Sequence, residues 1–333
     1  MTEEEFDIIK DTSMGRPHVV ILGAGASRAA FPNGDKNGKF LPLMNNLITV
    51  CGLDKILKNH GIQYDNNNFE EIYSKIHLDG NDLCLMELES TIFKYFQSLV
   101  ITDEPTIYDF LAISLRPKDV IATFNWDPLL WQAMKRNKRW ISMPHVAYLH
   151  GNVAIGFCNH DKQLGERGSK CPKCLNDFDE VNLLYPITKK NYKENPFIVA
   201  AWREIKKNLE NAYILTIFGF GASKNDDGAV SILEDAWGAV AKRNLEQIEV
   251  IDIKDEDELK ISWDQFIHSD HCEFKKEFVD SLLWKFPRRS CEALWAQNEE
   301  IQYIDPIGIP DSRGWAEIKK WYNLLIANEH LEN

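Results

Sequence analysis

The stretch that decides the fold is HVVILGAGAS at residues 18–27. The run from His18 to Leu22 is almost entirely apolar, which is typical of a central strand buried on both faces of a parallel sheet. The glycines that follow permit a tight turn, and the next residues open a helix whose free N–H groups can bind a phosphate. The stretch therefore predicts a strand–turn–helix unit that binds a nucleotide.

Similar apolar runs recur along the chain, separated by helical patterns such as the one at residues 229–242. We expect further strands at residues 119–123, 145–149, 213–218, 247–252 and 301–304. Strands that alternate with helices are typical of α/β folds with a parallel sheet. The sequence therefore predicts a doubly wound, Rossmann-like α/β fold.

Two segments interrupt this alternation. Residues 41–116 contain helical patterns and no strong strand, and they predict a helical insertion. Residues 152–191 are rich in Cys, Gly, Lys and Asp, and they predict a small zinc-ribbon-like module. We therefore expect one domain over residues 1–333, with a C-terminal helix in 311–333 and a Rossmann-like core formed by residues 15–40, 117–151 and 192–310.

Composition excludes several classes of protein. The 333 residues carry 38 Lys+Arg and 51 Asp+Glu, a formal net charge of −13, so we expect no direct binding to nucleic acid. No apolar run approaches the roughly 20 residues needed to cross a bilayer, and we expect no membrane contact. The start, Met1–Glu5, has no positive n-region, and the cysteine count is odd, at seven. We expect a cytoplasmic protein.

Polar residues follow the predicted strands at their carboxyl ends, where open α/β sheets bind ligands. Asn125 and Asp127 follow the second strand, His150 the third, and Asp252 ends the fifth. Each also has a simpler interpretation: Asn125 and Asp127 can cap a helix that begins near Pro128, and His150 can be a turn residue. The glycine loop has Arg28 where dehydrogenases need a third glycine, so hydride transfer is disfavoured.

The order of these motifs resembles that of the sirtuin family. Gly-Ala-Gly-Ala-Ser, Thr-x-Asn-x-Asp, His-Gly, a cysteine module and Gly-x-Gly-x-Ser follow one another between Val19 and Asp252, with the helical insertion unmatched. The resemblance implies that NAD⁺ binds here, with Asn125 and Asp127 facing the nicotinamide ribose and His150 as the base. The residues implied for NAD⁺ binding are Gly23, Ala24, Gly25, Ala26, Ser27, Gly219, Gly221, Ser223 and Asp252.

The cysteine module has the spacing of a metal site. Cys158 and His160 precede Cys171 and Cys174 by about a dozen residues, which predicts a tetrahedral, structural Zn²⁺ site. Sirtuins use two Cys-x₂-Cys pairs for this purpose, and here the first pair is Cys-x-His. The alternative is a loop without metal whose thiols are incidental.

Two departures from protein-deacylating sirtuins shape the functional expectation. FPNGDK at residues 31–36 replaces their Gly-Ile-Pro-Asp-Phe-Arg segment, and YPIT at 185–188 replaces the segment that pairs with an acyl-lysine peptide. We therefore expect hydrolysis of NAD⁺ to nicotinamide and ADP-ribose. The resemblance further implies a bacterial effector of anti-phage defence that depletes NAD⁺. Because a hydrolase that drains a central cofactor must be held inactive until it is triggered, we expect a regulatory partner or a homo-oligomer. The alternatives are an NAD-dependent protein deacylase or ADP-ribosyltransferase, and a non-catalytic NAD or ADP-ribose sensor.

Overall fold

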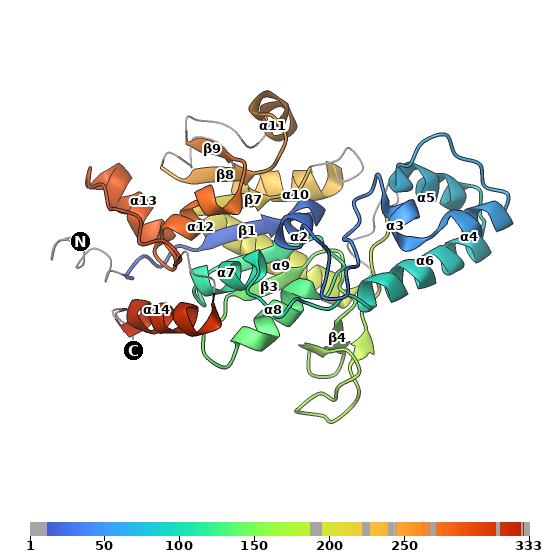
Figure 1. Cartoon of the computed structure of the whole chain (residues 1–333), viewed down its shortest axis with the longest axis horizontal. Helices are drawn as coiled ribbons and strands as arrows, with labels where there is room; N and C mark the ends of the chain where they lie inside the picture. The colour runs from blue at the N-terminus through green and yellow to red at the C-terminus, as the bar shows by residue number, and fades with distance from the viewer. Residues whose placement is uncertain are drawn as a thin grey trace.

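A computed structural model of the chain describes residues 12–186, 195–221, 227–238, 243, 245–264, 266, 271–310, 314–327 and 329. Its main element is a six-stranded sheet in the order β3-β2-β1-β7-β8-β9, in which all neighbouring strands are parallel. The strands are β1 (His18–Leu22), β2 (Val120–Thr123), β3 (His145–Tyr148), β7 (Ile214–Phe218), β8 (Gln247–Ile251) and β9 (Cys272–Lys275). The predicted doubly wound α/β fold is confirmed (Figure 1).

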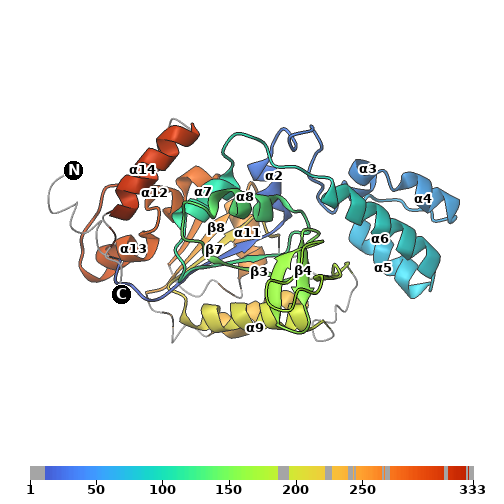
Figure 2. The same ribbon diagram turned by 90° about the horizontal axis from the view of Figure 1, so that it is seen from below.

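Both faces of the sheet are covered by helices. Along β1, Val20 and Leu22 join one apolar cluster and Val19 and Ile21 join the other, as the alternation of side chains along a strand requires. Figure 2 shows α9 on one face and α7 and α8 on the other. The helices of the core are α2 (Ala24–Ala30), α7 (Ile107–Ser114), α8 (Leu129–Asn137), α9 (Pro196–Asn211), α10 (Asp227–Trp237) and α11 (Glu256–Trp263).

The chain order places a switch point at the centre of the sheet. From β1 the chain adds β2 and β3 on one side, and then β7, β8 and β9 on the other. Ligands of open α/β sheets bind outside the carboxyl ends of the strands at such a point. A ligand site is therefore expected at the loops after β1, β2 and β7.

The predicted helical insertion contains α3 (Leu47–Cys51), α4 (Asp54–Asn59), α5 (Phe69–Leu78) and α6 (Asp82–Gln97). These four helices form a lobe that projects from one end of the sheet (Figures 1 and 2). The last helix of the segment, α7, instead packs against α2 and α8 of the core. A capping box between Thr106 and Asp109 fixes its first turn.

One predicted strand is wrong. Residues 301–304 form no strand, because Ile301 is 79% exposed and has a positive φ of 55°. The sixth position in the sheet belongs to β9, which precedes η3 (Phe278–Asp280), α12 (Leu282–Lys285) and α13 (Ser290–Glu299). The predicted C-terminal helix is α14 (Trp315–Ala327).

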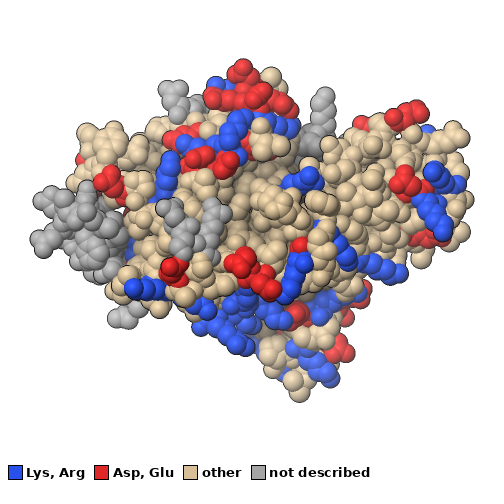
Figure 3. Space-filling model, in the orientation of Figure 1, with Lys and Arg blue, Asp and Glu red and all other residues tan. Residues whose placement is uncertain are grey.

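The cysteine-rich segment forms a second, three-stranded antiparallel sheet in the order β5-β4-β6. Its strands are β4 (Ile155–Cys158), β5 (Gln163–Glu166) and β6 (Asp179–Glu180). Figure 3 shows Lys and Arg gathered between α14 and this module, whereas acidic side chains gather over α11. Among the described residues, no helix combines the length and the apolar character that crossing a bilayer requires.

Candidate active site at the strand ends

A pocket of about 370 Å³ lies at the carboxyl edge of the main sheet. Five strands each contribute a residue from the turn at their end: Gly23 after β1, Asn125 after β2, His150 after β3, Gly219 after β7 and Asp252 after β8. The strand-end residues that the sequence singles out therefore meet in one cavity. The lobe closes another side of the pocket with apolar side chains such as Leu47 and Phe96, together with Leu43 from the loop before α3.

Most of the predicted binding residues line this pocket. They are Gly23, Ala24, Gly25, Ser27, Asn125, Asp127, His150, Gly219, Gly221 and Asp252. Ala26 is not among the lining residues, because it is fully buried on the core side of α2. Ser223 lies outside the described residues.

The glycine loop is locked against the end of β7 by backbone contacts. The Gly25 amide donates to the Gly219 carbonyl at 2.9 Å, and the Gly23 amide donates to the Phe218 carbonyl at 3.0 Å. A Cβ atom on Gly23 would lie 2.4 Å from the Gly219 carbonyl oxygen, closer than any side chain permits. Glycine is needed at position 23 because two backbone segments touch there.

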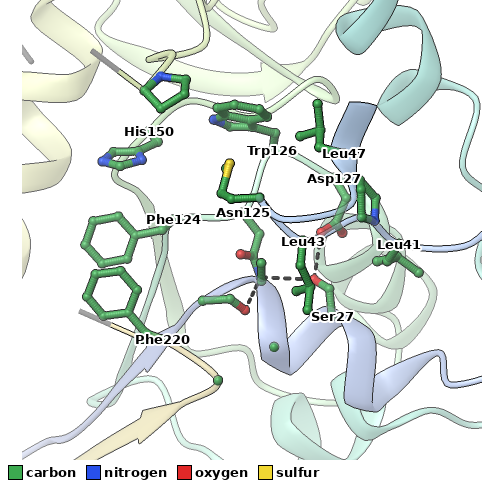
Figure 4. A pocket seen from close by; sticks show the side chains of 18 of the residues that line it. Ser27, Leu41, Leu43, Leu47, Phe124, Asn125, Trp126, Asp127, His150 and Phe220 are labelled. Atoms are coloured by element: carbon green, nitrogen blue, oxygen red, sulfur yellow. Dashed lines mark hydrogen bonds between the residues drawn. The ribbon is translucent and has the colours of Figure 1, made fainter. Parts of the chain in front are cut away.

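The Asn125 amide is held from below the pocket floor. Its Nδ2 atom donates to the Gly23 carbonyl at 2.8 Å and to Ser27 Oγ at 2.9 Å (Figure 4). The same atom lies 3.2 Å from the Tyr108 hydroxyl. The side chain is 8% exposed. With the nitrogen so engaged, the Oδ1 atom is the part of the amide left to accept hydrogen bonds from a ligand.

Asp127 lies at the same floor and is itself a lining residue of the pocket. Its Oδ2 atom accepts a hydrogen bond from Ser27 Oγ at 2.7 Å, and its Oδ1 atom accepts one from the Leu129 amide at 3.0 Å. Burial raises the pKa of this carboxyl, and the hydrogen bond from Ser27 opposes the rise. Asp127 therefore accepts a hydrogen bond from the first backbone amide of α8, although the N-cap position of that helix is Pro128, and it also orients Ser27 in the pocket.

His150 stands on the aromatic side of the pocket. Its ring meets the Phe124 ring edge-on, with centroids 4.7 Å apart, and Phe124 stacks on Phe220 with centroids 4.3 Å apart (Figure 4). The backbone carbonyl of His150 accepts a hydrogen bond from the Leu184 amide at 2.9 Å. His150 and Asn125 thus line one cavity from two different strands.

Three residues of the site are not indicated by any sequence pattern. Tyr108 contacts Ser27 and Asn125 from α7, and Phe220 stacks on the side of the pocket that holds His150. Asn152 ties the loops after β2 and β3 together, since its amide donates to the Asp127 carbonyl at 2.6 Å. A tyrosine in a helix, or a phenylalanine between glycines, is as common in a core as in a site, so the pattern alone could not identify them.

The cysteine module gathers four potential metal ligands. One ligand atom from each of Cys158, Asp161, Cys171 and Cys174 lies within 4.8 Å of the others. Cys158 Sγ is 3.5 Å from Cys174 Sγ, and Cys171 Sγ is 3.2 Å from an Asp161 carboxylate oxygen. Three thiols and one carboxylate around a common centre fit a tetrahedral, structural Zn²⁺ site.

His160, the predicted fourth ligand, is not in this group. Its side chain is 73% exposed, and its Nδ1 atom lies 3.0 Å from Asp161 Oδ1 on the outside of the cluster. The turn after β4 directs Asp161 inward, where its backbone amide also donates to Cys158 Sγ at 3.3 Å. The predicted ligand set is corrected at this one position.

Comparisons with known proteins give similarity at the level of solved structures. No family model matches the chain, and no curated protein matches it. A structure titled "Structural Basis for the Mechanism and Regulation of Sir2 Enzymes" shares 15% identity over 89% of this chain and 100% of that chain, with a TM-score of 0.43. A Sir2 homologue in complex with NAD shares 13% identity over 88% of this chain and 95% of that chain, with a TM-score of 0.39. The chain is thus similar to sirtuin structures over most of its length.

Proposed function

We propose that the chain hydrolyses the bond between nicotinamide and ribose in NAD⁺, giving nicotinamide and ADP-ribose. The observation that carries this proposal is the convergence of Asn125, His150 and Ser27, with Asp127 beneath them, in one pocket beside the Gly23–Gly25 turn. A nucleotide phosphate is favoured at such a glycine turn, and polar groups at the neighbouring strand ends then face the rest of the dinucleotide.

The chemistry needs few groups from the protein. Nicotinamide leaves as a neutral base, because the electrons of the broken C–N bond go to the cationic pyridinium nitrogen. The oxygen of a water molecule forms the new bond to the ribose carbon, and one proton is released. Asn125 Oδ1 accepts a hydrogen bond that orients this water or a ribose hydroxyl, and His150 takes the proton.

The buried charge at the floor supports the same step. Asp127 is 3% exposed, and its carboxylate reaches the pocket through the Ser27 hydroxyl. A fixed negative charge near the sugar stabilises the positive charge that develops on the ribose as nicotinamide departs. Because the environment is set before substrate binds, little reorganisation is needed during the reaction.

The direct test is nicotinamide release from NAD⁺ by the purified chain with no peptide present. His150→Ala is expected to lower the rate by about 100-fold or more, the usual contribution of a general base. His145→Ala is the matched control, because His145 lies on the same strand segment with its side chain 68% exposed, outside the pocket. Release that requires an acyl-peptide would support a deacylase, and tight binding with no turnover in any assembly would support a sensor.

We further propose that this activity depletes NAD⁺ in anti-phage defence, under the control of a partner protein or of self-association. The motif order of the sequence is what supports this role. The test is the NAD⁺ content of phage-infected bacteria that express the chain, compared with the same cells expressing Asn125→Ala. An equal NAD⁺ content in both would contradict the role and leave the chemistry of the purified protein unaffected.

A further inference from the structure

The Tyr108 hydroxyl lies beneath the pocket floor, where it contacts two functional side chains. It is 2.5 Å from Ser27 Oγ and 3.2 Å from Asn125 Nδ2, and the residue is fully buried. Tyr108 is not among the residues that line the pocket, so it does not touch a ligand there. Its ring packs edge-on against Phe31, with centroids 6.0 Å apart. This packing explains why an aromatic ring is found at position 108, but it does not explain the hydroxyl group.

The directions of the hydrogen bonds follow from counting protons. Ser27 has a single hydroxyl proton, and it donates that proton to Asp127 Oδ2. The bond between Tyr108 and Ser27 must then have the tyrosine as donor. The Ser27 oxygen accepts from Tyr108 on one side and from Asn125 Nδ2 on the other.

This arrangement allows the Asn125 amide only one orientation. Its nitrogen donates to the Gly23 carbonyl and to Ser27 Oγ, and both acceptors would repel an amide oxygen placed there. Tyr108 and Asp127 fix the orientation of the Ser27 hydroxyl, so that its second lone pair accepts the hydrogen bond from Asn125. The Gly23 carbonyl favours this orientation of the amide, and the Ser27 oxygen, held by the Tyr108 hydroxyl, reinforces it.

We propose that Tyr108 is a positioning residue that holds the Asn125 amide with its oxygen, and not its nitrogen, turned toward the reacting sugar and water. The inference rests on the proposed function, since it concerns the reaction that Asn125 serves. It assigns a role to α7, which is otherwise a packing helix against α2 and α8. The tyrosine acts through Ser27 and Asn125 and contacts no substrate.

The test compares Tyr108→Phe with Tyr148→Phe in the nicotinamide-release assay. Tyr148 is a matched control, because it is also buried, on β3, and its hydroxyl has no hydrogen-bond partner among the described residues. Tyr108→Phe is expected to lower kcat about three- to tenfold, the range for the loss of one neutral hydrogen bond, with KM within about twofold. An unchanged kcat in a folded Tyr108→Phe variant would overturn the proposal, whereas a wild-type chain without turnover would count against the function itself.

A second measurement needs no activity, and its first comparison needs no variant. In wild-type protein, the side-chain NH₂ protons of Asn125 are expected to exchange with solvent much more slowly than those of Asn323, which is exposed on α14. In Tyr108→Phe the Asn125 protons should exchange faster, because the serine that accepts from them is less fixed. Wild-type exchange as fast at Asn125 as at Asn323, followed by NMR, would overturn the proposal even if the variant failed to fold.

Discussion

The pocket and the cysteine module show two ways of fixing polar groups in place. In the pocket, Asn125, Ser27 and Asp127 satisfy one another on a floor supplied by the ends of parallel strands. In the module, three thiols and a carboxylate face one another across strands of only two to four residues. The polar groups of the pocket satisfy one another without a ligand. The thiols and the carboxylate of the module, in contrast, need a bound cation to hold them together. The main sheet thus holds the pocket residues in place, whereas a Zn²⁺ ion would hold the cysteine module in place.

Removing the metal should produce the largest effect. Zinc binding contributes about 10–16 kcal/mol to the folding of small zinc domains. The module's own apolar cluster is small, because it consists of Cys158, Cys171 and Phe178 with Cys174 packed against them. Cys171→Ser is expected to lower the zinc content from one equivalent to nearly none, measured by elemental analysis. Hydrogen exchange should rise across residues 155–180 while β1 and β7 stay protected. Equal loss of protection in both regions would mean that the metal stabilises the main sheet as much as the module.

The next effect concerns the charge at the pocket floor. Asp127→Asn removes the ionised acceptor of the Ser27 proton, and hydrogen bonds to charged groups contribute about 1.5–3 kcal/mol. We expect kcat/KM for nicotinamide release to fall about 10- to 100-fold. Asp235→Asn, at an exposed position of α10, should leave the rate unchanged. An Asp127→Asn enzyme within twofold of wild type would show that the floor carries no functional charge.

The glycine loop offers a smaller and purely steric test. Gly23→Ala places a methyl group 2.4 Å from the Gly219 carbonyl oxygen, so the backbone must move, at a cost of about 1–3 kcal/mol in the free energy of unfolding. Gly221→Ala is the control, because a Cβ there meets no atom of the described residues within 4 Å. Denaturant unfolding curves measure both. Similar losses in the two variants would mean that the contact between the β1 and β7 turns is not tight.

The smallest expected effect distinguishes two neighbouring candidate ligands. His160→Ala should retain one equivalent of zinc, because that side chain lies outside the cluster, whereas Asp161→Ala should bind zinc more weakly. Competition with a chelator, followed by a cobalt-substituted absorption spectrum, measures the difference. A spectrum that changes with His160 and not with Asp161 would restore the ligand set predicted from the sequence.

The strands that define the sheet were predictable because they are buried on both sides. β1, β7 and β8 are continuous runs in which every residue is buried, and their glycine or acidic ends mark the pocket. The edge strand β9 was missed, since Cys272–Lys275 alternates with charged residues and is largely half-buried. Residues 301–304 have a strand-like composition and lie exposed in a loop, so composition alone misassigned them.

The site was predictable at the level of strand ends and not at the level of its contacts. The carboxyl ends of parallel strands lie together in any such sheet, which is why residues as distant as Gly23 and Asp252 could be grouped. The choice between His160 and Asp161 depends on how one turn after β4 directs two adjacent side chains, and spacing does not encode that. Tyr108 reaches the site through packing of α7 on α2, which no local pattern reports.

The two ends of the module lie side by side against the pocket. Gly151 has a positive φ of 80°, a Cβ there would lie 2.7 Å from the Asn182 carbonyl oxygen, and the Leu184 amide donates to the His150 carbonyl. The module therefore leaves the main sheet after His150 and returns to it near Leu184, so that its two ends lie next to each other. A foreign hairpin grafted there would need equally close ends, and apolar residues in place of Ile155 and Phe157, which pack in the apolar cluster of the main sheet.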